Sequence, residues 1–444
     1  MNNKLSLGHL AIPKILRGKR LALFVTLAMQ LATSWSVDFM SSGYHVDFEE
    51  TYGKGHSPNV FSVSASPDGG YAFAGTWSTN YGAWLVKTNR SGKEQWEQSF
   101  RTDKTISLQR AVLALSTKDG AYLMCGETND PDLIGSEWKD FGSLARPAAA
   151  FVAKIDTNGR LEWRKIFGRL GKYWRNAIYR GVAVEDGFVF LGTTKSIVDG
   201  QDTSAAKHVI SSFWLFKINN AGDLIWERTF PMDDGEYLLP SPVVEWYAKP
   251  LVDTFGNIVL AVATETILSE KLNGKLVLAS PATIPGPRKE VLLIKLGRDG
   301  SELKRTRLAF GVGPSLIKAG DGYHLLDNDV GDHGGIRSVR LDADLNVVSE
   351  KAISAKHFWV QSAIPGPNGG LHLAGYHRTP PNERGQAAIA YLSQDGDLRH
   401  EKLFGHNSWP ADLAGGASPA EMVFLWFGGW GETSARLTKL RLAD

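Results

Sequence analysis

The sequence predicts an all-β protein, a seven-bladed β-propeller of four-stranded antiparallel blades. One motif recurs as "VKTNRSGKEQW" at 86–96, "AKIDTNGRLEW" at 153–163 and "FKINNAGDLIW" at 216–226. A Gly-rich turn followed by a short apolar strand precedes each copy, as in "PDGGYAFAG" and "KDGAYLMCG". Segments with helical periodicity are nearly absent. Each unit therefore reads as four short strands joined by tight turns.

Six units share the same spacing when they are aligned on the glycine of the motif. The aligned positions are Gly92, Gly159, Gly222, Gly300, Leu345 and Gly396. A basic or phenolic residue stands five positions earlier, at Lys87, Lys154, Lys217, Lys295, Arg340 and Tyr391. Four positions after the glycine come Trp96, Trp163 and Trp226, and then the degenerate residues Lys304, Ser349 and His400. Repeats of four strands that bury their faces only against neighbours are typical of a propeller.

The ends of the chain set the predicted number of blades. Lys439 occupies the motif lysine position of a further unit, and the chain stops at Asp444, where its glycine would stand. The missing fourth strand matches "FEETYG" at 48–53, which resembles "WRKIFG" at 163–168 and places Phe48 at the tryptophan position. We expect residues 44–444 to form one domain whose strand 44–53 completes the seventh blade beside 434–442 and removes two free edges.

The motif "KxDxxGxxxW" resembles the tryptophan-docking repeat of PQQ-like and WD40-like propellers. The "DGGYxxxG" strand followed by "WLVKxxxxG" is similar to repeats of exported bacterial propellers, over about residues 44–444. This resemblance implies a structural tryptophan that packs between blades. Quinoproteins of the PQQ class use a vicinal disulfide and a calcium site, whereas this chain has a single cysteine, Cys125, and no matching segment. We therefore expect no cofactor.

The first 34 residues indicate export. They contain five basic residues and no acid, an apolar run at 21–32 and the small residues "ATS" at 32–34, which together predict a signal peptide over 1–34. Twelve apolar residues are short for a membrane span of roughly 20 residues, so an uncleaved anchor is the alternative. The expected location is periplasmic or secreted. The rest of the chain has 44 basic and 47 acidic residues, which argues against a nucleic-acid binder. Cys125, in "YLMCGE", is expected to be a small buried hydrophobe.

Function is expected on one face of the ring, because the long insertions (127–149, 195–211 and 265–289) and the blade-to-blade crossings fall there. Aromatic, histidine and basic residues gather in these crossings, and such groups anchor protein partners and stack on sugars. The candidate binding residues are Tyr173, Trp174, Arg175, Tyr237, Trp246, Tyr247, His357, Phe358, Trp359, His406 and Trp409.

Patterns for catalysis and metal binding are sparse. No nucleophile elbow, HExxH or phosphate loop occurs. "DNDVGDHGG" at 327–335 supplies Asp327, Asp329 and Asp332 as weak cation ligands, but Gly331 and Ser338 stand where a calcium loop needs oxygen donors. A solvated polar turn is the preferred interpretation. For the repeated basic residues we expect a structural role, with the stems covering apolar surface and the charged heads in water.

The leading hypothesis is an exported, non-enzymatic propeller that binds another protein through its aromatic face, for example to neutralise a toxin or hydrolase or to organise an envelope assembly. The alternative is a carbohydrate binder or carbohydrate-active enzyme on the same face. Its candidate acid and base groups would be Asp233, Asp234, Glu236 and Glu245. A pair of carboxylates at a deep pocket would favour the enzyme, and a flat aromatic surface would favour protein binding.

Overall fold

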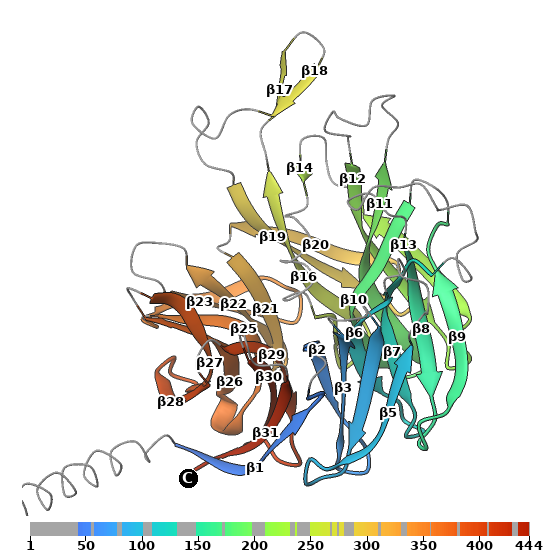
Figure 1. The fold of residues 1–444 in the computed structure, drawn as a ribbon. Helices are drawn as coiled ribbons and strands as arrows, with labels where there is room; N and C mark the ends of the chain where they lie inside the picture. The colour runs from blue at the N-terminus through green and yellow to red at the C-terminus, as the bar shows by residue number, and fades with distance from the viewer. Residues whose placement is uncertain are drawn as a thin grey trace, which may run out of the picture.

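The computed structural model of the chain shows seven antiparallel sheets arranged in a ring (Figure 1). It describes residues 43–54, 57–77, 82–100, 109–130, 148–170, 174–197, 209–230, 236–237, 249–266, 269–272, 275–278, 288–309, 312–329, 335–355, 357–379, 382–405, 408–428 and 434–443. Within these residues the only helical segment is the one-turn 3-10 helix η2 (Pro367–Gly369). The predicted all-β, seven-bladed propeller is therefore confirmed.

The strands follow one another through the blades in chain order. Blade 1 is β2 (Pro58–Ala65), β3 (Tyr71–Trp77), β4 (Ala83–Thr88) and β5 (Glu94–Phe100); blade 2 is β6 (Gln109–Ser116), β7 (Tyr122–Thr128), β8 (Ala149–Ile155) and β9 (Leu161–Phe167). Blade 3 is β10 (Trp174–Val184), β11 (Gly187–Ile197), β12 (Val209–Ile218) and β13 (Leu224–Phe230). In blade 4, β14 (Glu236–Tyr237) and β15 (Leu251–Val252) both pair with β16 (Ile258–Thr266), which is followed by β19 (Arg288–Leu296) and β20 (Glu302–Ala309).

Blade 5 is β21 (Val312–Ala319), β22 (Gly322–Asp329), β23 (Gly335–Leu341) and β24 (Val347–Ile353); blade 6 is β25 (Phe358–Pro365), β26 (Leu371–Thr379), β27 (Asn382–Leu392) and β28 (Leu398–Phe404). Blade 7 is β29 (Ser408–Gly415), β30 (Glu421–Gly428), β31 (Ala435–Leu442) and β1 (Tyr44–Tyr52). The insertion predicted at 265–289 contains a separate hairpin, β17 (Ser269–Leu272) and β18 (Lys275–Leu278), which projects from blade 4 in Figure 1.

The N-terminal strand closes the ring as predicted. β1 pairs antiparallel with β31 from Tyr44 opposite Leu442 to Tyr52 opposite Ala435, and Figure 1 shows blue β1 beside red β31. The Tyr44 hydroxyl donates to Nδ1 of His372 in blade 6 at 3.0 Å, and Nε2 of His372 donates to the Pro419 carbonyl at 2.8 Å. Burial lowers the pKa of His372, which keeps this bridging ring neutral. The closure therefore combines a strand pairing with a buried side-chain link between blades 6 and 7.

Burial on both faces explains the composition of the middle strands. Every residue of β3 and of β7 is buried, so these strands read as continuous apolar runs rather than as alternating ones. The described residues form seven buried clusters, each drawn from two adjacent blades. Between blades 1 and 2, for example, Leu85 packs in one cluster with Met124 and Phe151. Cys125 is fully buried, as expected, and burial raises the pKa of its thiol.

A β-bulge recurs in the innermost strands. One residue of the inner strand has no partner opposite it, and this extra residue is Phe61, Val112, Tyr179, Gln361 or Ala411 in blades 1, 2, 3, 6 and 7. In four of these blades a glycine of the second strand lies opposite the residue before the bulge. A methyl group on Gly126 would lie 1.8 Å from the Arg110 carbonyl oxygen. The close approach of the bulged strand thus explains why these second strands contain a glycine after their apolar run.

The motif tryptophans join neighbouring blades. A methyl group on Gly159 would lie 2.9 Å from the Trp96 ring, and the equivalent distances are 2.8 Å from Gly222 to Trp163 and 2.8 Å from Gly300 to Trp226. Each glycine has a φ near +80° (82°, 80° and 78°), which favours glycine for a second reason. The expected packing between blades is confirmed. The three rings lie on the outermost strands and are partly buried.

The same junction exists all around the ring with different side chains. Phe48 of β1 takes the tryptophan place against Gly92, as predicted. Lys304 Nζ instead donates to Asn346 Oδ1 at 2.6 Å, beside Leu345, which keeps the positive φ (61°) without glycine. The stem of Lys351 covers Gly396, and the His400 ring covers Gly43. We call the contacts made by Phe48, Trp96, Trp163 and Trp226 the aromatic junctions. We call the contacts made by Lys304, Lys351 and His400 the polar junctions.

The repeated lysines are structural, but their heads are paired with acids and are not free in water. Lys87 is 2% exposed and donates to Asp68 Oδ2 at 2.6 Å and to the Thr88 carbonyl at 2.7 Å. The other pairs are Lys154 with Asp119 (2.8 Å), Lys217 with Asp186 (2.8 Å), Lys295 with Asp253 (3.2 Å) and Lys439 with Glu421 (3.3 Å). Tyr391 replaces the lysine in blade 6 and donates to the Pro367 carbonyl at 2.6 Å. These contacts tie the first turn of a blade to its third strand.

Candidate functional site

The two faces of the ring differ in their connections. The tight turns between first and second strands and between third and fourth strands share one face, which we call the turn face; Lys87, for example, joins Asp68 of one such turn to Gln95 beside the other. The opposite loop-rich face carries the insertions and the blade crossings. Within the described residues, Trp174 and Arg175 belong to β10, Phe358 and Trp359 to β25, and Trp409 to β29. These residues begin inner strands and do not lie in loops, which corrects the expectation.

Aligning the inner strands on the bulge separates buried from exposed candidates. The residue three positions before the bulge is buried in all five strands, and in blade 6 it is Phe358, which is 4% exposed and packs between blades 5 and 6. Phe358 is thus a core residue and is not available to a partner. Two positions before the bulge stand Asn59, Arg110, Ala177, Trp359 and Trp409. Because side chains alternate along a strand, this second position points to the opposite face of the blade from the first. Ala177 is buried there, whereas Trp409 is 43% exposed.

An aromatic patch formed by Trp359, Tyr376 and Trp409 spans blades 6 and 7. Trp359 lies directly opposite Tyr376 in the register of β25 and β26. The rings of Tyr376 and Trp409 meet edge to face, with centroids 5.2 Å apart and an interplanar angle of 84°. Trp409 is 43% exposed, whereas Trp84, Trp214 and Trp426 of the core are at most 2% exposed. The patch therefore presents aromatic surface that the core does not use.

Two histidines lie beside this patch. His357 is exposed and has a φ of 73°, and its ring centroid is 6.0 Å from that of His377. Nδ1 of His377 is hydrogen-bonded to Glu401 Oε1 at 2.5 Å. The carboxylate holds His377 in place on β26 and gives the border of the patch a polar character.

The same face is polar at blades 2 and 3. Glu127 is 3% exposed and accepts hydrogen bonds from Arg175, from Nε at 3.0 Å and from Nη2 at 2.9 Å. Arg110, at the position equivalent to Trp359 and Trp409, lies 3.8 Å from the same carboxylate. The predicted site residue Arg175 thus stabilises a buried acid, in a geometry that fits the two-pronged guanidinium. Its neighbour Trp174 carries the Arg169 guanidinium over its ring at 4.9 Å.

A charged link crosses between opposite blades. Lys249, just before β15 of blade 4, forms an ion pair with Asp412 of β29 in blade 7. Asp412 is 3% exposed and also accepts a hydrogen bond from the Val63 amide of blade 1 at 3.2 Å and from Ser362 of blade 6 at 3.2 Å. One carboxylate thereby joins four blades, which favours a structural role at the centre of the ring.

Several predicted residues lie outside the described residues. These are Tyr173, Trp246, Tyr247 and His406 of the binding face, Asp233, Asp234 and Glu245 of the alternative site, and Asp332. For Tyr237 and Glu236 the structure describes only the backbone pairing of β14 with β16, and for Asp329 only its place in β22.

Of the three aspartates considered as cation ligands, only Asp327 has a side chain that the structure describes. Asp327 is 1% exposed and accepts hydrogen bonds from Arg337, from Nη2 at 2.9 Å and from Nε at 3.1 Å. Its charge is therefore compensated by a guanidinium. In the part of the chain that the structure describes, no group of three or more His, Cys, Asp or Glu residues is arranged to hold a metal ion. The same residues include no helix long and apolar enough to cross a membrane.

Comparisons with known proteins found distant likenesses among solved structures. No protein-family model matches the chain, and no curated protein matches it in sequence. Among solved structures, the chain is similar to the β-propeller domain of the Trilobed protease from Pyrococcus furiosus (TM-score 0.47, 13% identity, covering 87% of this chain and 98% of that one). It is also similar to the Dos1 propeller (TM-score 0.45, 11% identity, 91% and 96%) and to a gluconolactonase from Xanthomonas campestris (TM-score 0.37, 9% identity, 89% and 89%). Likenesses this low say nothing about the activity of this chain.

Proposed function

We propose that this protein is an exported, non-enzymatic propeller that binds another protein on its loop-rich face, with the aromatic patch of Trp359, Tyr376 and Trp409 at the centre of the contact. Large, rigid amphipathic rings dominate the energetics of protein interfaces because they bury much area at a small entropic cost. The polar border formed by His357, His377 and Glu401 matches the polar rim of such interfaces.

The observation that carries this proposal is the position of the two tryptophans in the repeat. At the same place two residues before the bulge, blades 1, 2 and 3 have Asn59, Arg110 and Ala177. The fold therefore accepts a small, an amide or a charged side chain there, and tryptophan is not a requirement of the blade. Two adjacent blades nevertheless place an indole at this point next to Tyr376: Trp409 is exposed, and Trp359 is partly buried.

A glycan is the alternative occupant, because sugars also stack on aromatic rings. None of the three patch rings lines either of the two cavities described below. Carbohydrate binding would be recognised by retention of the protein on immobilised envelope polysaccharide, and this retention would be lost in the same variants.

The test compares the patch with a matched tryptophan elsewhere. Trp409→Ala, Tyr376→Ala and the control Trp96→Ala would be used to capture partners from the native envelope, and the affinity of the captured protein would be measured for each variant. We expect the patch variants to bind about 30-fold more weakly, or about 2 kcal/mol, at an unchanged melting temperature. Trp96→Ala should lower the melting temperature and leave the affinity unchanged. Unchanged affinity in both patch variants would refute the proposal.

Export rests on the segment 1–34 and has its own test. N-terminal sequencing of protein from fractionated cells should find the mature chain beginning near Trp35 in the periplasmic or secreted fraction. An intact Met1 on cytoplasmic protein would contradict this part of the proposal.

A further inference from the structure

A cavity of 170 Å³ lies between blades 5 and 6, and we call it the blade 5–6 cavity. Blade 5 contributes His324, Arg340, Ser349 and Lys351 to its wall, and blade 6 contributes the turn residues around Gln394. Arg340, Ser349, Lys351 and Gln394 are exposed, so the cavity can be reached from solvent.

Blade 5 lacks the tryptophan of the repeat beside this cavity. Ser349 occupies that position in blade 5, and the glycine of blade 6, Gly396, is retained. The side chain of Lys351 covers Gly396 in place of an indole, and Ser349 and Lys351 both line the cavity.

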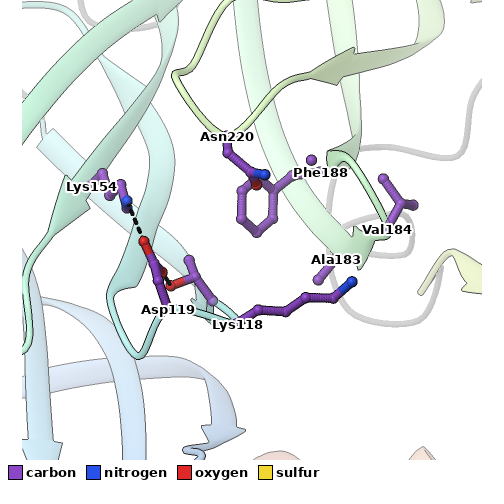
Figure 2. Close-up of a pocket in the computed structure, with 9 residues that line it drawn as sticks. Lys118, Asp119, Lys154, Ala183, Val184, Phe188 and Asn220 are labelled. Carbon is purple, nitrogen blue, oxygen red and sulfur yellow. Dashed lines mark hydrogen bonds and ion pairs between the residues drawn. The ribbon is translucent and has the colours of Figure 1, made fainter.

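The charge of this cavity differs from that of its counterpart between blades 2 and 3, which measures 140 Å³ (Figure 2). There the motif lysine Lys154 binds Asp119 at 2.8 Å, as Figure 2 shows, and Glu162 at 3.0 Å. Arg340 is the equivalent of Lys154 in blade 5. Within the described part of the chain, no carboxylate lies within ion-pair distance of Arg340.

A second cation of the cavity has also lost its acid. Lys165 of blade 2 donates to the Ala221 carbonyl at 2.9 Å and forms an ion pair with Asp223 at 2.8 Å. Lys351 makes the equivalent contact with the Asp395 carbonyl. The acid equivalent to Asp223 is Asp397, which pairs with Arg399 at 2.7 Å; this pairing and the more distant charge of Lys351 lower the pKa of Asp397. The residues that line the blade 5–6 cavity thus include two cations and no acid.

His324 adds a polar group with unused hydrogen-bonding capacity. It lies opposite Arg340 in the register of β22 and β23. Its Nδ1 is buried and has no hydrogen-bond partner among the described residues. Burial and the neighbouring Arg340 guanidinium lower the pKa of His324, so the ring is neutral and able to offer one N–H donor.

We propose that the blade 5–6 cavity is a binding site for a small oxyanion, a phosphate or carboxylate group of a soluble ligand, held by Arg340 and Lys351 with His324 as a further donor. A guanidinium presents paired N–H groups that match the two oxygens of such an anion, and an ammonium adds a second charge. The site lies on the turn-face side of the ring, away from the aromatic patch. It is independent of the proposed protein contact, and either can fail without the other.

Titration calorimetry with inorganic phosphate and, separately, with malonate tests this site and distinguishes the two oxyanion sources. We expect at least one of them to bind the wild-type protein at millimolar concentration or below. Arg340→Gln should weaken that binding about tenfold, because a charged hydrogen bond is lost. Ser349→Trp should also weaken it, since Ser349 lines the cavity and an indole there would take up part of its volume while both cations remain. Lys165→Gln, the matched lysine of blade 2, should bind like the wild type.

Melting temperatures accompany each titration. Arg340 is exposed and has no ion pair in the described part of the chain, so Arg340→Gln should melt like the wild type. The site is refuted if neither anion binds the wild type. Equal binding by Arg340→Gln, or equal losses in Lys165→Gln and Arg340→Gln, would also overturn it, because the anion would then be held by general surface charge.

Discussion

The two halves of the ring use the same junction position in different ways. At the four aromatic junctions a planar ring lies flat on the next blade, and Trp96 and Trp226 also donate their indole N–H to the carbonyls of Thr157 (2.9 Å) and Arg298 (3.1 Å). At the three polar junctions Lys304, Lys351 and His400 replace the ring. The aromatic half buries apolar area at each junction, whereas the polar half relies on single hydrogen bonds and side-chain stems.

This difference coincides with the distribution of candidate sites. The aromatic patch lies on blades 6 and 7, and the blade 5–6 cavity lies beside it in the blade order of the ring. Both belong to the polar half. A repeat that departs from its own pattern leaves a side chain or a space that the scaffold does not need. The regular half maintains the ring, and the degenerate half is free to carry recognition.

The largest loss of stability is expected when the pairing of β1 with β31, which closes the ring, is removed. Deleting residues 1–53 removes β1, its pairing with β31, the Phe48 junction and the Tyr44 link to His372. The loss exposes the edge of β31 and one face of blade 7, so the protein should aggregate or lose its cooperative unfolding transition. Circular dichroism melting and size-exclusion chromatography would measure this. A deletion of residues 1–42 is the control, and an unchanged transition in the longer deletion would contradict the role of β1.

The second prediction compares an aromatic with a polar junction. Trp163→Ala should lower the free energy of unfolding by about 2 kcal/mol, less than for a fully buried tryptophan because the ring is partly exposed. Lys304→Ala should lower it by about 0.5 kcal/mol or less, because its junction rests on one exposed hydrogen bond. Urea unfolding of both variants gives the two values. Equal losses would show that the halves do not differ in strength.

The third prediction separates backbone strain from contact with the ring. Gly159 and Gly369 both have positive φ, 82° and 71°, so alanine is strained at either position. A methyl group on Gly159 would lie 2.9 Å from the Trp96 ring, while one on Gly369 would lie 3.4 Å from the Gln394 side chain. Gly159→Ala should therefore destabilise the protein by about 1 kcal/mol more than Gly369→Ala. The difference between their denaturant midpoints measures the junction alone.

The smallest effect concerns the stability of the protein at acidic pH. The Lys154 ammonium and the Thr117 hydroxyl hold the pKa of Asp119 at about 2, below its ordinary value of 3.8. Because the folded pKa is the lower one, this stabilisation is present above pH 4 and is lost as pH falls from about 4 to 2. Asp119→Asn should flatten the dependence of unfolding free energy on pH in that window. Arg340→Gln should not change it, since Arg340 has no carboxylate partner in the described part of the chain. An equally steep dependence in Asp119→Asn would contradict the assignment.

Local patterns were sufficient for the architecture. The spacing between the basic residue, the glycine and the tryptophan repeats because each copy forms the same turn and the same junction, so strand order, blade number and the β1 closure all followed from the sequence. Which candidate residues lie on the surface was harder to predict from the sequence. Phe358 and Trp359 are adjacent aromatic residues in one crossing, yet one lies in the core and the other on the surface.

The alternation of side chains decides between these two residues, and its phase depends on the bulge at Gln361. A bulge is set by the approach of one inner strand to a glycine of the next strand, as at Gly375, and a short apolar run does not mark it. The partners of the repeated basic residues were missed for a related reason. Lys154 and Asp119 are 35 residues apart, and only the pairing of three strands brings their charges together.

The sequence by itself determined the repeat, the all-β fold and the closed seventh blade, because fixed spacing marks the turns and strands of each unit and the two ends of the chain carry complementary parts of one unit. The tertiary structure alone decided which aromatic residues reach the surface, that the repeated lysines are neutralised, and that Ser349 leaves a cationic cavity between two blades. Those properties arise where separate blades meet, and the distances and charges across such a contact depend on residues that have no fixed separation in the chain.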